Sequence, residues 1–307
     1  MAGITAALVK KLRETSGAGM MDCKKALSET DGNMDEAIDW LRKKGLAAAA
    51  KKSGRVAAEG LVDVTTNGAT GVVIELNSET DFVARNPEFQ NFVSSVAQVA
   101  LSKGGDFDQT SAAMMNGGKS VVDSVTEMVG TIGENLSFRR SAGITVTEGM
   151  VASYVHGAIS PNQGKIGVLV GLESAANADE LAEFGKQLAM HVAAANPLWV
   201  AQDDVDTEVV DREREVLADQ ARESGKPEEI VQKMVDGRLR KYYEEVCLMD
   251  QTFVVDGESK ISKAVQAAAD KVGAPVKVAG FVRFQLGEGI EKEEADFAAE
   301  VAATAGN

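Results

Sequence analysis

The chain has 307 residues, of which 44% are hydrophobic and 26% charged, a composition typical of a globular protein with room for two domains. Its formal net charge is −15, so phosphate groups should repel it, which argues against a general nucleic-acid-binding protein and against binding to anionic membranes. There is no apolar run of about 18 residues, no secretory signal pattern, and only two distant cysteines, Cys23 and Cys247, so we expect a cytoplasmic protein without disulfides.

Residues 1–50 have the apolar spacing of three short helices. Thr5 can cap the first of them, and Asn33 followed by Glu36 resembles a capping box at the start of the third. The stretch 47–55, rich in Ala, Lys and Gly, is interpreted as a linker. A unit this small is marginal by itself, so we expect it to lean on the rest of the chain or to serve as a docking module.

Met20 and Met21 stand beside a Gly-rich break and offer flexible apolar surface, which suits contact with a partner. A place in the core of the small helical unit is an equally open interpretation. The nearby cations Arg13, Lys24 and Lys25 would ordinarily form a solvated face.

The apolar period changes from residue 56 onward. Two strands flank the turn signal Asn67-Gly68, and Pro87 can open a helix. The remaining elements expected in this half are a Gly-rich loop with a weak helix at 103–119, a helix at 121–132 and a strand at 136–140.

The most informative stretch is 79–87, with the sequence ETDFVARNP, between a hydrophobic strand and the helix that Pro87 opens. It places Phe82 next to Asp81 in a polar connection. A ring there is poorly placed for the chain's own core and well placed to enter the core of another protein. The stretch therefore suggests a protein that prises a partner open.

A similar pattern returns about 96 residues later, because 167–172 resembles 71–76 and the following helix again begins with Glu-Phe. We interpret this as an internal duplication of a strand–loop–helix unit, with chance similarity as the alternative. The second connection, at 174–178, is small and polar. A strand–helix connection of this kind therefore does not itself require an exposed Phe.

Two charge-dense helices at 207–224 and 228–245 are joined by Gly-Lys-Pro, which predicts an antiparallel helical hairpin. Its apolar stripe should hold the hairpin together, and contact between two copies of the chain is the alternative. The stripe comprises Val209, Val210, Val216, Leu217, Ile230, Met234 and Leu239. A helix at 261–272, a strand at 276–286 and a helix at 292–303 are expected after it.

Signals for catalysis or cofactor binding are weak. There is no phosphate-binding loop and no nucleophile elbow, and neither His156 nor His191 lies near a cysteine at metal-ligand spacing. His191 falls in an apolar helix and should have a packed or helix-surface role, and His156 should sit at a strand end, where a structural role is more common. We therefore expect no cofactor, no metal and no covalent chemistry, but a protein that acts through its contact surface.

Several motifs in order resemble one family. Residues 15–27 (TSGAGMMDCKKAL) and 80–84 (TDFVA) look like the two signatures of bacterial elongation factor Ts, the guanine-nucleotide exchange factor of elongation factor Tu. Shorter landmarks follow at 132–135, at Tyr154-x-His156-Gly157, at 225–227 and at 287–301. The resemblance spans nearly the whole chain.

By this resemblance the fold is α+β, with a core of two related subdomains that contain antiparallel sheets. The implied parts are a three-helix module similar to ubiquitin-associated domains (1–54), a first core subdomain (55–145), a second (146–286) with the hairpin inserted at about 206–246, and a C-terminal helical module (287–307). Two departures from the family pattern are the Gly-rich stretch 103–119 and a longer loop at 158–165 after His156-Gly157.

The resemblance also implies site residues. Phe82 would wedge between helices of the nucleotide domain of elongation factor Tu near its magnesium ion, with Asp81 making polar contacts and Thr80 and Val83 shaping the loop. The module at the N-terminus would contact the same domain, and His156 another domain. The residues implied for the module are Arg13, Met20, Met21 and Lys24.

Two other classes of function stay open. A scaffold protein could bind partners through the three-helix module and dimerise through the hairpin. An enzyme with an unrecognised carboxylate site would lose turnover when Asp81 is changed to Asn. The sequence leaves the stoichiometry with elongation factor Tu undecided.

Overall fold

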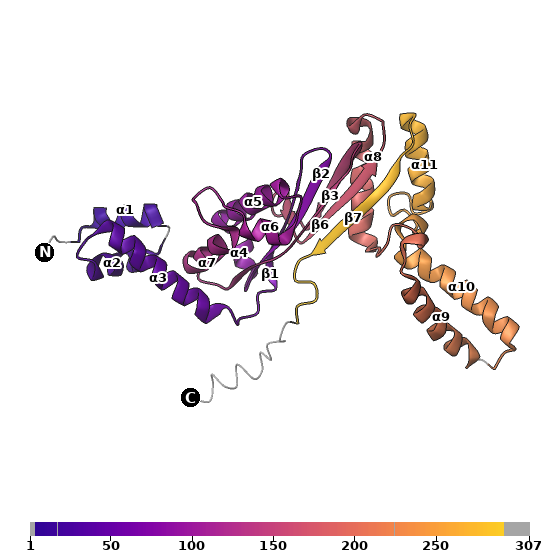
Figure 1. Cartoon of the computed structure of the whole chain (residues 1–307), viewed down its shortest axis with the longest axis horizontal. Helices are drawn as coiled ribbons and strands as arrows, with labels where there is room; N and C mark the ends of the chain where they lie inside the picture. Colours follow the sequence, from indigo (N-terminus) through magenta and orange to yellow (C-terminus); the bar gives the residue numbers. More distant parts are fainter. Residues whose placement is uncertain (1–3, 17, 224, 292–307) are drawn as a thin grey trace.

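The computed structural model describes residues 4–16, 18–223 and 225–291. The described chain is elongated, with a unit of three helices at one end, two sheets in the middle and a helical hairpin at the other end (Figure 1). The three helices are α1 (Ala6–Ser16), α2 (Met20–Glu29) and α3 (Met34–Lys52).

The predicted caps of the helical unit are confirmed. The Thr5 hydroxyl accepts a hydrogen bond from the Leu8 N–H at 3.2 Å. The Asn33 side chain accepts from the Asp35 and Glu36 N–H groups, and its amide donates to the Glu36 carboxylate at 2.8 Å. The small core of the unit is made by Val9, Leu12, Cys23, Ala26, Leu27 and Ala37.

The prediction of a linker at 47–55 is wrong, because α3 continues through it to Lys52. Ala and Lys favour helix, and the extra turns have tertiary support. Gly45 of α3 crosses closely over Gly130, and Ala49 joins the main core. The helical unit is therefore connected to the rest of the chain by a continuous helix and not by a flexible segment.

The first sheet has the strand order β3-β2-β1-β5 and is antiparallel throughout. The predicted hairpin is confirmed: Gly68 takes a φ of +77°, and the Asn67 N–H donates to the Thr70 carbonyl at 2.8 Å. The third strand is longer than predicted, and the loop after His156 contributes a short fourth strand. The strands are β1 (Glu59–Thr66), β2 (Thr70–Ser78), β3 (Leu136–Thr145) and β5 (Gln163–Gly164).

Four helices cover the outer face of this sheet. They are α4 (Asp81–Ala84), α5 (Pro87–Ser102), α6 (Phe107–Ala112) and α7 (Val121–Ile132). The helix predicted to open at Pro87 is confirmed as α5, and its Phe89, Val93 and Val96 are fully buried against Leu61, Ile74 and other residues of the sheet.

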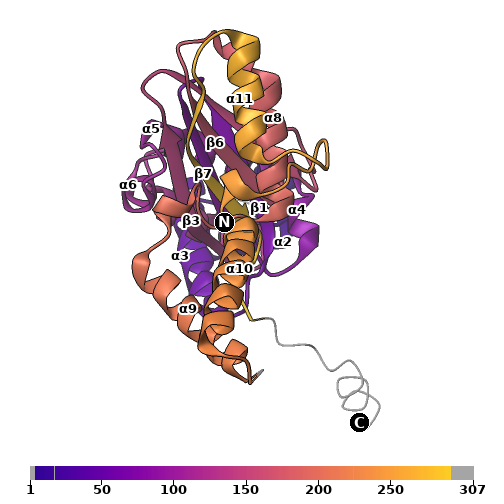
Figure 2. The ribbon, with the colours of Figure 1, turned by 90° about the vertical axis from the view of Figure 1, so that its right-hand side faces the viewer.

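The second sheet has the order β4-β6-β7, again antiparallel. Its strands are β4 (Gly149–His156), β6 (Ile166–Glu173) and β7 (Lys277–Gln285). Its outer face is covered by α8 (Ala178–Ala195) and α11 (Ile261–Val272), which lie side by side in Figure 2. Two short 3₁₀ turns, Gln202–Asp204 and Leu248–Asp250, flank the hairpin.

The inner faces of the two sheets pack on each other through Val62, Val64 and Val73 of the first and Val151, Leu169 and Phe284 of the second. The core thus has four layers in the order helix, sheet, sheet, helix, and the predicted α+β class with antiparallel sheets is confirmed.

The two sheets carry the marks of the predicted repeat. Each has a β-bulge at an edge strand: Arg139 is the extra residue of β3, opposite Glu75 and Leu76 of β2, and Ala279 is the extra residue of β7, opposite Gly171 and Leu172 of β6. Gly60 and Gly149 take the same unusual φ, +119° and +125°, where an added Cβ would strike the carbonyl oxygens of Leu76 and Leu172. Corresponding irregularities at corresponding places support two copies of one unit.

The helical hairpin consists of α9 (Thr207–Arg222) and α10 (Glu228–Val246) and projects from the second sheet (Figure 1). Leu217, Ala221 and Val231 are among the residues that hold it together. Val216 and Ile230, predicted in the same stripe, are exposed instead. The helix predicted at 292–303 lies outside the described residues.

Both cysteines are buried and free. Within the described ranges, no helix has the length and apolar character needed to span a membrane.

Candidate functional site

The connection between β2 and α5 forms one short turn of helix, α4, set between two fixed ends. At its start the Ser78 hydroxyl donates to the Thr80 carbonyl at 2.9 Å, and Thr80 is extended. At its end Asn86 caps α5, with Pro87 at the first helical position. The residues predicted as the wedge, 80–83, therefore occupy a compact and defined segment.

The four residues of α4 divide between core and solvent. Val83 and Ala84 are buried and belong to the core cluster that contains Leu76 and Phe89. Asp81 is exposed, and Phe82 is 79% exposed as a residue. The outward orientation predicted for this ring is confirmed, while the partner contact predicted for it stays a prediction.

The segment after α7 holds this loop in place. The Glu134 carboxylate accepts hydrogen bonds from the Thr80 N–H at 2.9 Å and from the Thr80 hydroxyl at 2.6 Å. The Glu79 carboxylate accepts from the Asn135 N–H at 2.5 Å and pairs with Arg55 at 3.4 Å. The exposed Phe82 ring thus lies on a loop that is hydrogen-bonded to the segment after α7 and ion-paired to the segment after α3.

The second set of predicted residues lies on the helical unit. Met20 and Met21 begin α2 and are 59% and 75% exposed, so the alternative that they form the unit's core is wrong. Arg13 and Lys24 are exposed as well. Apolar and cationic side chains are therefore free for contact on this unit, and their role stays a prediction.

His156 is the last residue of β4 and is exposed, as expected for a strand end. Its Nδ1 lies 3.4 Å from the Tyr154 hydroxyl. The longer loop that follows returns to the first sheet, where Gln163 is buried and donates to Asp63 and to the Gln90 carbonyl. The position of His156 is consequently fixed by both sheets.

His191 is fully buried, so of the two roles predicted for it, packed or on the helix surface, the packed one is confirmed. Its Nε2 lies 2.8 Å from Gln251 Oε1, and its Nδ1 accepts from the Val254 N–H at 3.3 Å. An acceptor nitrogen facing an N–H and a donor facing a carbonyl oxygen describe a neutral ring. Burial lowers the pKa of His191, and the bond to Gln251 only partly offsets this.

This histidine predicts a pH dependence of stability. The unfolded chain binds a proton at the ordinary histidine pKa of about 6.5, whereas the folded chain resists it, so stability should fall as the pH is lowered through that value. Urea denaturation at pH about 7.5 and 5.5 measures the loss. His191→Gln should remove this part of the loss, and His156→Gln, which changes the chain's only other histidine, should leave it unchanged. If His156→Gln removed the loss of stability and His191→Gln did not, the assignment of this pH dependence to His191 would be wrong.

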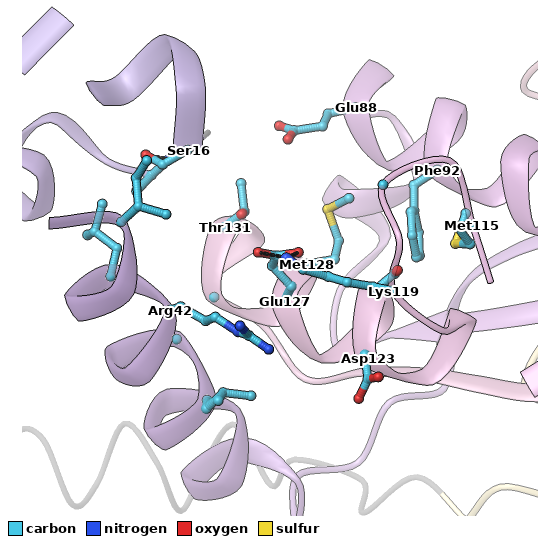
Figure 3. A pocket seen from close by; sticks show the side chains of 18 of the residues that line it. Ser16, Arg42, Glu88, Phe92, Met115, Lys119, Asp123, Glu127, Met128 and Thr131 are labelled. Atoms are coloured by element: carbon cyan, nitrogen blue, oxygen red, sulfur yellow. Dashed lines mark hydrogen bonds and ion pairs between the residues drawn. The ribbon is translucent and has the colours of Figure 1, made fainter. Parts of the chain in front are cut away.

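A groove of about 1370 Å³ separates the helical unit from the core (Figure 3). Arg42 reaches into it from α3, opposite Glu127 and Met128 of α7. Lys119 already pairs with Glu127 at 2.6 Å, and Lys44 pairs with Asp22. Its lining carries charges of both signs, so the groove has no strong preference for a charged ligand.

Sequence reasoning missed this groove and the anchoring role of Glu134, because both combine residues more than 50 positions apart. The only signal for Glu134 was its place in the landmark at 132–135. Among the described residues there is no cluster of His, Cys, Asp and Glu able to hold a metal ion.

Comparisons with known proteins agree on one family. A family model described as "Elongation factor TS" matches residues 79–288, more than half of the chain. The chain is 63% identical over 307 residues to "Elongation factor Ts" of Paramagnetospirillum magneticum, covering 100% of this chain and 98% of that one. The proteins of the same name from Rhodospirillum centenum and Parvibaculum lavamentivorans are 62% and 61% identical, with 100% and 99% of both chains covered.

Proposed function

This chain belongs to the elongation factor Ts family of translation elongation factors, and on that basis we propose that it binds elongation factor Tu carrying GDP and accelerates the release of GDP, so that GTP can replace it. It does so by disturbing the magnesium and phosphate site of the GTPase, without making or breaking a covalent bond.

One observation carries this proposal: Phe82 is 79% exposed on a loop whose backbone is held by Glu134. Exposed aromatic rings on otherwise ordered loops are poor for stability and good for recognition. Because the loop is already ordered, little conformational entropy is lost when the ring enters a partner.

The mechanism follows from how a GTPase holds GDP. A phosphate loop and a magnesium ion offset the phosphate charge, and GDP leaves when those contacts are broken. In our proposal Phe82 separates helices beside the magnesium site, and Asp81 makes polar contacts there. Thr80 and Val83 hold the loop in shape and do not contact the partner, since Thr80 is bound to Glu134 and Val83 is buried.

Burial of one Phe ring supplies about 2–3 kcal/mol, which is too little to displace a nucleotide by itself. Further contacts must add to it. We assign these to Arg13, Met20, Met21 and Lys24 of the helical unit on the nucleotide domain, and to His156 on another domain of elongation factor Tu. All five side chains are exposed.

Linkage fixes the direction of the cycle. If the factor weakens GDP binding by some ratio, GDP weakens binding of the factor by the same ratio. The nucleotide-free complex is therefore the tight one, and incoming GTP ejects the factor. The division of the chain at 54/55, 145/146 and 286/287 is part of the same proposal.

Stopped-flow release of a fluorescent GDP analogue from elongation factor Tu tests the proposal. We expect this chain, at micromolar concentration, to raise the release rate by orders of magnitude, with saturation as the complex fills. An unchanged rate would overturn the proposal and favour the alternative of a scaffold that uses the helical unit and the hairpin.

The hairpin is the proposed surface for a homodimer. Val216 and Ile230 are exposed on it, while its own packing uses other side chains. Sedimentation velocity of the chain and of a Val216→Asp variant decides this: a dimer lost in the variant supports the surface, and a monomer in both excludes it.

A further inference from the structure

The ends of β2 and α7 meet in a reciprocal arrangement of two carboxylates. Glu134 accepts from the backbone N–H of Thr80, and Glu79 accepts from the backbone N–H of Asn135. Each glutamate therefore binds the residue that directly follows the other glutamate: Thr80 follows Glu79, and Asn135 follows Glu134. The two segments are 54 to 56 residues apart in sequence, so this contact is tertiary and specific.

Thr80 shows that this contact has displaced an ordinary one. It stands at the N-cap of α4, where a Thr hydroxyl usually accepts a hydrogen bond from the first turn of the helix. Here its side chain makes no cap bond and instead donates to Glu134 at 2.6 Å. Both hydrogen-bond donors of Thr80, its N–H and its hydroxyl, are thus directed to one carboxylate.

The Glu134 carboxylate itself follows directly after the end of α7, which is held firmly in the core. α7 ends at Gly133, whose φ of +86° turns the chain, and the Lys52 ammonium at the end of α3 donates to the Gly133 carbonyl. Val125 and Val129 fix α7 in the same core as Val83. The amide of Asn135 donates to the Arg55 carbonyl at 2.7 Å, which brings the segment after α3 into the same junction.

We propose that Glu134 is a positioning residue for nucleotide exchange: it holds Thr80 so that the Phe82 ring stands outward in the orientation that enters elongation factor Tu, and with Asn135 it joins this loop to the helical unit through α3. This inference rests on the proposed function and deepens it. Glu134 acts through Phe82 and needs no contact with the partner itself.

Glu134→Gln is the informative change, because the amide keeps the shape and one acceptor but loses the second charged acceptor. We expect the maximal rate of GDP release at saturating factor to fall roughly tenfold, the effect of losing one charge-assisted hydrogen bond. The concentration for half-maximal rate should change less, since the helical unit still docks.

The matched control is Glu127→Gln, on the helix that directly precedes Glu134 and with the same change in charge. Its carboxylate pairs with Lys119 and does not touch the Phe82 loop. It should release GDP at the wild-type rate. Thr80→Val provides a second variant that removes only the hydroxyl, and it should reduce the rate in the same direction.

A double-mutant cycle separates positioning from a merely structural role. In a Phe82→Ala background, Glu134→Gln should have no further effect on the maximal rate. Amide hydrogen exchange of residues 79–86 should be faster in Glu134→Gln, with the rest of the described chain unchanged.

A wild-type rate in Glu134→Gln would overturn the inference. So would the same fold-loss with and without Phe82, because Glu134 would then act by another route. Failure of the proposed function is distinct, since it appears as no acceleration by the wild-type chain, and the inference falls with it.

Discussion

Phe82→Ala should lower the rate of GDP release from elongation factor Tu by about 30- to 160-fold, because about 2–3 kcal/mol of ring burial is lost from the state in which exchange occurs. The chain's own melting temperature should hardly change. Since Phe82 is 79% exposed as a residue, removal of its ring takes away almost no core contact, and surface substitutions of this kind usually alter stability by less than about 0.5 kcal/mol. Stopped-flow release and thermal denaturation of the same preparation measure the two effects.

Phe89→Ala is the matched control for that comparison. Phe89 is seven residues further along the chain, is fully buried and belongs to the core that contains Val83. It should destabilise the chain by about 3–5 kcal/mol, with any loss of exchange following the unfolded fraction. If Phe82→Ala behaved in this way instead, the ring would be structural and the proposed wedge would be wrong.

The sequence was informative about this site where the pattern is local. An aromatic residue between a strand and a Pro-led helix predicted the outward ring, and the small second connection at 174–178 indicated that a strand–helix connection does not need one. That connection is a short bend in the structure, with Asn177 capping α8. Caps, the first hairpin turn and the helical hairpin were likewise local signals.

The rest depended on contacts that no local pattern contains. By its composition the stretch 47–52 resembles a linker. It is helical because Gly45 packs against Gly130 and Ala49 is buried in the core, and neither contact can be predicted from the local sequence. The short strand β5 exists because buried Gln163 meets Asp63, 100 residues earlier. The role of Glu134 also depends on a contact between distant residues. Thr80 was predicted as a site residue, but its hydrogen bonds to Glu134 were not.

The repeat explains one difference between the two sheets that the sequence could not interpret. At the bulge the first copy has Glu75 and the second has Gly171. An added Cβ at Gly171 would lie 2.9 Å from Ile144, so the second copy has little room for a side chain there. In the first copy the same position holds a fully buried carboxylate, which has to be compensated.

That compensation comes from the bulge itself. Arg139 is the extra residue of β3, so Arg139 and Arg140 both reach Glu75, at 3.0 and 2.5 Å. Glu75 also accepts from Asn77 and from the Gly287 N–H at 2.8 Å. Burial alone would raise the pKa of Glu75, but the bonds from Gly287, Asn77 and Arg140 outweigh it and hold the pKa below its ordinary value.

Glu75→Ala should therefore destabilise the chain by about 3 kcal/mol, the lower end for breaking a buried ion pair. The lower end applies because both arginines are partly exposed, at 27% and 28%, and water can reach them. Urea denaturation at neutral pH measures the loss. Since the folded pKa is depressed, the difference from wild type should be full above the ordinary glutamate pKa of about 4.3 and shrink as the pH falls below it.

Glu288→Ala is the control that tests whether burial or mere charge pairing matters. Glu288 pairs with Arg140 at 3.3 Å and with the mostly buried Arg283 at 3.7 Å, but its own side chain is 43% exposed, so its loss should cost less than the loss of the fully buried Glu75 carboxylate. Equal losses of stability in the two variants would contradict this, because they would show that an exposed carboxylate beside the arginines stabilises the fold as much as the buried one does. A large effect at Glu75 alone means that the bulge in β3 brings two arginines to one buried charge that stabilises the fold, and this charge joins the end of β7 to the first sheet, directly at Gly287 and through Arg140 at Gln285.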